Sequence, residues 1–226
     1  MKIAVRRGHN SEAIGARALL IEEVEGEKVK DAVVKYLKIA GQEVLDVSPG
    51  PMGTNEDLAY GVNKANNAGV DLFVSIHFNK AYDHYDGAIG SECWTIGPGN
   101  ATNIAQRIVN ELAEAGFKNR GVKHSRYYEL RKTVASAIIV ETCFVEASKD
   151  VELYKRLGPD EIGRRIAEGI VGHEIKAPKP STEDKKDIYR IKVDGKQIGA
   201  YSQVDNLYNV AKENWGSAKE IDIERV

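Results

Sequence analysis

The sequence predicts an α/β domain, a twisted and mostly parallel sheet with helices on both faces, followed by a small C-terminal ββαβ domain. Up to about residue 176, short β-rich runs alternate with segments whose apolar residues recur at helical spacing. The runs at 70–76 and 135–140 are continuously apolar, which is typical of strands covered on both faces. The chain then becomes polar and proline-bearing before a second structured segment begins.

The first half of the chain contains three expected strands and two expected helices. A β-rich run at 2–5 opens the chain. Residues 27–40 place apolar side chains three and four positions apart, as in an amphipathic helix, and a glycine follows to end it. A strand is expected at 43–47. Thr54, with an acidic residue three positions later, resembles a capping box and predicts a second helix. The apolar strand at 70–76 follows.

The second half continues the alternation. A strand is expected at 88–96, and apolar residues spaced over 104–112 predict a helix that closes before a glycine. The run at 135–140 is another buried strand. Pro159, followed by two acidic residues, is typical of the first turn of a helix and predicts where the last helix begins.

The composition divides the chain into a domain at 1–176, a linker at 177–187 and a small domain at 188–226. In the last part, two β-rich runs flank an Asp194-Gly195 turn and predict a hairpin, which a helical segment and a third strand follow. A unit of about 40 residues has little core of its own. Pairing as a homodimer, or docking on a ligand, would therefore stabilise it.

Bulk composition excludes several classes of function. The 226 residues are 42% hydrophobic and 29% charged, with a formal net charge of −2. This balance gives no bulk attraction for nucleic acid or for an anionic membrane. No run is long enough for a signal peptide or a membrane span, so we expect synthesis in the cytoplasm and release by another route. Cys93 and Cys143 lie in apolar stretches and are expected to be buried, reduced thiols.

Three polar residues interrupt the ends of apolar strands. His9 follows the first strand, His77 ends the run Val-Ser-Ile-His, and Glu141 follows Ile-Ile-Val. Because ligand sites in open α/β sheets form beyond the carboxyl ends of the strands, these side chains are expected to converge. A lone strand-end histidine is more often structural, whereas a glutamate after three apolar residues needs a partner to offset its desolvation.

Two histidines with one carboxylate form a recurrent catalytic zinc set that leaves a position open for water. The acidic run at 22–25, Glu-Glu-Val-Glu, lies ahead of the first long helix and offers the missing carboxylate. On its own, such a run more often stabilises a helix N-terminus. Spacing does not decide which of its members would bind a metal.

Five segments, in this order, resemble zinc-dependent N-acetylmuramoyl-L-alanine amidases of bacterial autolysins and phage endolysins. The resemblance covers residues 1–173, and its most specific parts are Ser-Ile-His-Phe-Asn and Val-Glu-Thr-Cys-Phe. The five segments are Arg-Gly-His-Asn (7–10), the glutamate-rich segment that runs into Glu-Lys-Val-Lys (27–30), Asp-Leu-Phe-Val-Ser-Ile-His-Phe-Asn (71–79), Asn-Arg-Gly-Val-Lys (119–123) and Ala-Ile-Ile-Val-Glu-Thr-Cys-Phe-Val (137–145).

The resemblance implies one Zn²⁺ held by His9, His77 and a glutamate, with Glu141 as the catalytic carboxylate. Counting back from the glycine after the first helix selects Glu22, with Glu23 as the alternative, because the usual Glu-Lys pair occurs too late here. The implied reaction cleaves the amide between N-acetylmuramic acid and L-alanine of peptidoglycan. The alternatives are a zinc carboxypeptidase or aminopeptidase acting on wall peptides, and a non-catalytic wall-binding protein.

The small C-terminal domain fits the layout of wall hydrolases that carry a targeting module, and its tyrosines and Trp215 are candidate binding residues. These aromatics could equally fill a small core. The missing signal peptide favours a phage endolysin released through a holin, or a sporulation autolysin freed by cell lysis. Either would act on the cell wall after release.

Overall fold

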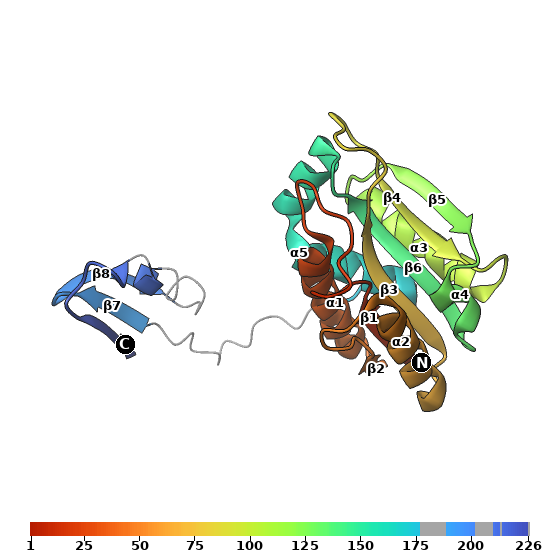
Figure 1. Cartoon of the computed structure of the whole chain (residues 1–226), viewed down its shortest axis with the longest axis horizontal. Helices are drawn as coiled ribbons and strands as arrows, with labels where there is room; N and C mark the ends of the chain where they lie inside the picture. The colour runs from red at the N-terminus through yellow and green to blue at the C-terminus, as the bar shows by residue number, and fades with distance from the viewer. Residues whose placement is uncertain (177–188, 202–209, 213, 226) are drawn as a thin grey trace. The chain divides into compact units, whose positions relative to one another are not determined.

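The chain forms two compact units, Met1–Ala177 and Pro178–Val226, in the computed structural model (Figure 1). The structure describes residues 1–176, 189–201, 210–212 and 214–225. The predicted linker at 177–187 lies outside the described residues.

The first unit is built on a six-stranded mixed sheet with the order β2-β1-β3-β6-β4-β5. Neighbouring strands run parallel except β4 and β6, which are antiparallel. The predicted α/β fold with a mostly parallel sheet is therefore confirmed. The strands are β1 (Lys2–Arg7), β2 (Glu43–Asp46), β3 (Leu72–Asn79), β4 (Ser91–Thr95), β5 (Asn119–His124) and β6 (Ser136–Phe144).

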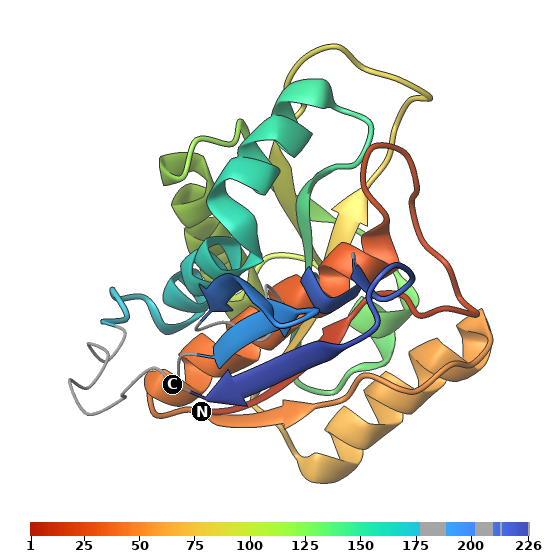
Figure 2. The same ribbon diagram turned by 90° about the vertical axis from the view of Figure 1, so that its left-hand side faces the viewer.

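Helices cover both faces of this sheet. The larger apolar core joins one face to α1 (Glu22–Ile39), α3 (Asn100–Glu114) and α5 (Ser148–Val171). A smaller core joins the other face to α2 (Thr54–Ala68) and α4 (Tyr128–Lys132). In Figure 2, α1 and α2 lie on opposite sides of the strands β1 and β2. This arrangement buries β3 and β6 on both sides, which explains their continuous apolar sequences.

Several elements differ from the sequence prediction. The element α5 contains two helical segments on either side of a kink at Gly158 (φ 80°, ψ 160°): the second begins at Pro159, as predicted, and the first, from Ser148, was not predicted. The strand β5 and the five-residue helix α4 were not predicted. Strand β4 pairs antiparallel with β6, whereas a simple alternation of strands and helices predicts a parallel neighbour.

The second unit contains a three-stranded antiparallel sheet with the order β8-β7-β9. Its strands are β7 (Tyr189–Val193), β8 (Lys196–Tyr201) and β9 (Ile221–Arg225), and the predicted hairpin turns at Asp194 and Gly195. Residues 210–212 are helical, and the rest of the predicted helix up to residue 209 lies outside the described residues.

Two further expectations concern the chain as a whole. Cys93 and Cys143 are buried and free, as predicted. Within the described part of the chain, no helix combines the length and apolar character needed to cross a bilayer.

Candidate metal centre and active site

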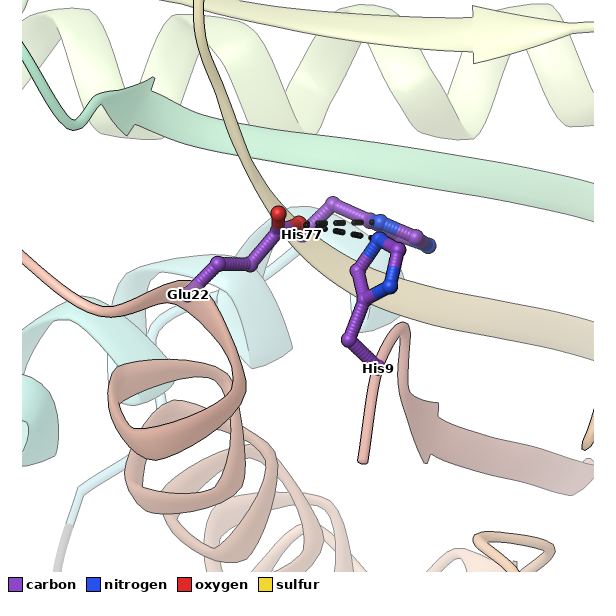
Figure 3. A group of neighbouring side chains, drawn as sticks. All are labelled: His9, Glu22 and His77. Carbon is purple, nitrogen blue, oxygen red and sulfur yellow. Dashed lines mark hydrogen bonds and ion pairs between the residues drawn. The ribbon is translucent and has the colours of Figure 1, made fainter. Parts of the chain in front are cut away.

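Three side chains from different elements converge beyond the carboxyl ends of β1 and β3 (Figure 3). His9 lies in the loop after β1, His77 lies near the end of β3, and Glu22 is the first residue of α1. One donor atom from each residue lies within 4.8 Å of the others. The structure therefore brings together the three residues selected from the sequence as candidate metal ligands.

The spacing of the donor atoms suits a small divalent cation. Glu22 Oε1 lies 3.1 Å from His77 Nδ1 and 3.6 Å from His9 Nε2. Ligand atoms of a tetrahedral zinc site are about 3.3 Å apart, because each lies about 2.0–2.1 Å from the metal. Two imidazoles and one carboxylate are also a common catalytic zinc set. The residues present therefore fit Zn²⁺.

The carboxylate of Glu22 is fixed by the backbone on two sides. Its Oε1 accepts a hydrogen bond from the N–H of Phe78 at 2.9 Å, and its Oε2 accepts one from the N–H of Ala16 at 2.5 Å. Glu23, the alternative ligand, forms an ion pair with Arg17 instead and lies outside the cluster. The geometry thus favours Glu22 over Glu23.

Glycine provides room for the cluster at two positions. A Cβ atom at Gly8 would overlap the imidazole ring of His77, and a Cβ atom at Gly15 would overlap the Glu22 carboxylate and the ring of His9. The loop backbone must therefore approach the ligands more closely than any other residue type permits.

The cluster attracts positive charge. Burial alone would lower the pKa of His77, but the neighbouring carboxylates of Glu129, Glu22 and Glu141 raise it to about 10. Burial and the neighbouring charge of His77 lower the pKa of His9. Burial opposes ionisation of Glu22, yet its contacts with His77 hold its pKa below the ordinary value. The carboxylates that favour an imidazolium here would also favour a bound cation.

Glu141 lies on β6 directly opposite His77 on β3, so both side chains project from the same face of the sheet. Its Oε2 atom is buried and has no hydrogen-bond partner among the described residues. Burial, together with the charges of Glu22, Glu92 and Glu129, raises the pKa of Glu141 to about 7, against the opposing effect of His77. A carboxyl group with this pKa can exchange a proton near neutral pH.

A pocket of about 240 Å³ adjoins these residues. His77, Glu129 and Glu141 supply its polar lining, and the remaining walls are apolar or aromatic. They are formed by Leu58, Tyr127, Tyr128 and Ile139.

The structure adds residues that sequence reasoning missed. Arg6, Asp57 and Glu129 are buried beside His77, and Arg6 forms ion pairs with both carboxylates. Arg6 carried a usable signal, because an arginine follows the apolar run of β1. No pattern in the sequence pointed to Glu129, because it lies in a five-residue helix and the residues that it contacts are distant in the sequence.

The other histidines lie apart from the metal cluster. His84 is exposed in the loop after β3, His124 contacts Thr95 Oγ1, and His173 is exposed just beyond α5.

A candidate His-Glu-His metal site at the carboxyl ends of the strands, with a half-buried glutamate beside it, is an arrangement that suits a hydrolytic α/β enzyme. The family model described as N-acetylmuramoyl-L-alanine amidase matches residues 3–172. The chain belongs to this family.

Individual relatives agree with this placement. An uncharacterised protein of Clostridium perfringens is 46% identical over 94% of this chain, and the amidase LytC of Bacillus subtilis is 30% identical over 76%. The chain spans 65% of the length of the first relative and 35% of the second. The catalytic domain of an endolysin that targets Clostridia difficile superposes with a TM-score of 0.71 at 25% identity, covering 78% of this chain and 99% of that domain.

Proposed function

We propose that this protein is a zinc-dependent peptidoglycan hydrolase that cleaves the amide bond between N-acetylmuramic acid and the L-alanine of the stem peptide. The observation that carries the proposal is the convergence of His9, Glu22 and His77 next to Glu141, in a chain of the amidase family. Together these four residues supply a metal site and a proton acceptor.

In this proposal, His9 Nε2, His77 Nδ1 and a Glu22 oxygen hold the metal. The carbonyl oxygen of Ala13 lies 3.0 Å from His9 Nδ1 and can only accept a hydrogen bond, so the Nε2 lone pair is free for the metal. Zinc at this position would supply the Lewis acidity that polarises the substrate carbonyl and activates water.

Glu141 serves as the general base. Its carboxylate accepts a proton from the attacking water and then delivers it to the departing amine of L-alanine. In the metal-free protein the pKa of Glu141 is about 7, and a bound cation would lower it, so the carboxylate is ionised and ready to accept the proton at neutral pH. The buried Oε2 atom, which lacks a partner among the described residues, is available for this exchange.

The neighbouring pocket receives the groups around the scissile bond. A lactyl ether and an alanine each present a methyl group next to a polar amide. Leu58 and Ile139 offer apolar contacts for such methyl groups, whereas Tyr127 and Tyr128 combine an apolar ring with a hydroxyl.

Analysis of the products of purified peptidoglycan tests the proposal. The expected result is new N-terminal alanine amines, without new reducing sugars and without released D-alanine. Release of D-alanine or of other amino acids would favour a carboxypeptidase or aminopeptidase. The absence of any product from a zinc-loaded protein would indicate a non-catalytic wall-binding protein.

Variants connect the activity to the site. His77→Ala is expected to lose both zinc and turnover, whereas the exposed His84→Ala is expected to keep both. Zinc retained at full stoichiometry in His77→Ala would contradict the ligand assignment.

The C-terminal unit is proposed to hold the enzyme on the wall. Trp215 is 79% exposed and lines a pocket with Ala211, Lys212 and Gly216, a combination that suits a sugar face. Trp215→Ala in the full chain is expected to reduce sedimentation with purified walls and to leave hydrolysis of a soluble muropeptide unchanged. Equal sedimentation of the two proteins would reject this role.

A further inference from the structure

A buried ion network lies beneath the candidate metal centre. Arg6 is fully buried, and Asp57 and Glu129 are each 2% exposed. The Arg6 guanidinium forms an ion pair with Asp57, and its Nη1 lies 3.3 Å from Glu129 Oε1. It also donates to the backbone oxygens of Arg7 at 2.8 Å and of Gly8 at 3.2 Å, which fixes the loop entrance next to His9.

The network reaches His77 through the edge of the ring that faces away from Glu22. His77 Nδ1 faces Glu22, whereas Nε2 lies 3.0 Å from Ser75 Oγ and 3.7 Å from Glu129 Oε2. Ser75 is fully buried on β3, two residues before His77 and on the same side of the strand. The charge of Arg6 and the neighbouring side chains of His77 and Ser75 lower the pKa of Glu129, against the effect of its burial.

We propose that Glu129, acting with Ser75, is a positioning residue that holds the Nε2–H of His77 and so directs its Nδ1 lone pair at the metal. This inference rests on the proposed function, since it concerns how one of the proposed ligands is oriented. A carboxylate behind a metal-binding histidine fixes the tautomer and the ring orientation and increases the basicity of the ligand atom.

Glu129 does not belong to the metal-ligand set itself. It lies at the Nε2 edge of the ring, whereas Glu22 and His9 lie at the Nδ1 edge. A single ion bound to Nδ1 therefore cannot also contact Glu129. Its pairing with the buried Arg6 further fixes the carboxylate in place.

The charges of the network agree with this role. Arg6 carries one positive charge, and Asp57 and Glu129 carry two negative charges, so the buried group has a net charge of −1. An excess negative charge in the protein interior needs a cation nearby. The protonated ring of His77 supplies one in the free protein, and the proposed metal would supply one in its place.

A second branch of the same network orients His9. Asp57 Oδ1 accepts a hydrogen bond from Asn10 Nδ2 at 3.1 Å, and Asn10 Oδ1 accepts one from the N–H of Ala13. The carbonyl of Ala13 in turn accepts from His9 Nδ1 at 3.0 Å. The two histidines are thereby held in opposite tautomers, His9 presenting Nε2 and His77 presenting Nδ1.

Two-dimensional ¹H–¹⁵N NMR of the histidine rings, recorded on the zinc-loaded wild-type protein, determines the tautomer of His77 directly. The expected result is that Nε2 of His77 carries the proton and Nδ1 binds the metal. A proton on Nδ1, with Nε2 bound to zinc, would overturn the inference without need of any variant.

Zinc affinity, measured by competition with a chromophoric chelator, provides the second readout. Glu129→Gln is expected to bind zinc about 10- to 100-fold more weakly than the wild type, and Ser75→Ala is expected to weaken it in the same direction. Cobalt-substituted samples should show a changed visible spectrum in both variants, because the ring orientation changes.

Glu168→Gln is the matched control, because Glu168 is also a buried carboxylate paired with an arginine but lies on α5. It is expected to lower the melting temperature and to leave zinc affinity unchanged. A Glu129→Gln protein that loses stability alone, with zinc affinity within about twofold of the wild type, would reject the positioning role. A wild-type chain that binds no zinc would reject the proposed function and this inference with it.

Discussion

Glu141 and His77 occupy directly opposed positions on the adjacent parallel strands β6 and β3. One strand therefore carries a candidate metal ligand, and its neighbour carries the candidate base. Because the two groups belong to separate strands and Glu141 is not in the ligand cluster, their roles can be separated by substitution.

Glu141→Gln is expected to keep one zinc per chain and to lower kcat by about 10²- to 10⁴-fold, because the amide cannot accept the proton of the attacking water. Elemental analysis and initial rates on purified peptidoglycan measure the two quantities on the same sample. A variant that retains more than about a tenth of the wild-type rate would show that another group accepts the proton.

The neighbouring residues Glu22 and Glu23 provide a matched pair, since they differ in position but not in chemistry. Glu22→Gln is expected to lose most zinc affinity, because the charged ligand oxygen is replaced by a neutral amide. Glu23→Gln removes only the ion pair with the half-exposed Arg17 and is expected to bind zinc like the wild type. Equal zinc affinity of the two variants, determined by chelator competition, would contradict the selection of Glu22.

Gly8→Ala is expected to displace the His77 ring, and so to weaken zinc binding and lower the melting temperature, because the added methyl group overlaps the imidazole. Gly26→Ala is the control within α1. A Cβ atom there meets only the Ile76 carbonyl oxygen at 3.6 Å and the Arg7 Cβ at 3.9 Å, so it should raise stability by about 0.5–1 kcal/mol and leave zinc binding unchanged. Zinc titration and thermal unfolding of both variants would detect an error in either expectation.

Zinc affinity is expected to depend on pH well above the ordinary titration range of histidine. The pKa of His77 is raised to about 10, so below that pH the free protein carries a proton that the metal must displace. The zinc dissociation constant should therefore fall about tenfold for each unit of rising pH between roughly 7 and 9. An unperturbed histidine would give a constant value above about pH 7. Chelator competition at several pH values distinguishes a falling zinc dissociation constant from a constant one. A constant value over this range would show that His77 is neutral before the metal binds.

Much of the fold was predictable because strand and helix patterns are local. The apolar runs of β3 and β6, together with the polar residues that end them, are sufficient to place His77 and Glu141 at one edge of the sheet. The acidic run at 22–25, expected ahead of the first helix, forms the first turn of α1, and Glu22 was selected within it only by the count that the family resemblance implies.

The parts of the fold and of the candidate site that were not predicted depend on contacts between residues that are distant in the sequence. The antiparallel pairing of β4 with β6 joins strands that are distant in the sequence, so local sequence does not encode it. Glu129 contacts Arg6, which is far away in the sequence, and its short helix has no periodicity to reveal a buried face. Pro159 does start a helical segment, as its sequence predicts, but the preceding segment from Ser148, joined to it by the kink at Gly158, was missed.

The two backbone N–H groups that hold the Glu22 carboxylate bear on how the protein would tolerate loss of the proposed metal. They belong to the loop before α1 and to β3, so the backbone keeps this ligand in place rather than the ion. Metal binding then orders little of the chain, unlike in small zinc domains that unfold when the ion is removed. Chelation should thus silence the enzyme reversibly, leaving a folded protein that regains its activity when zinc is returned.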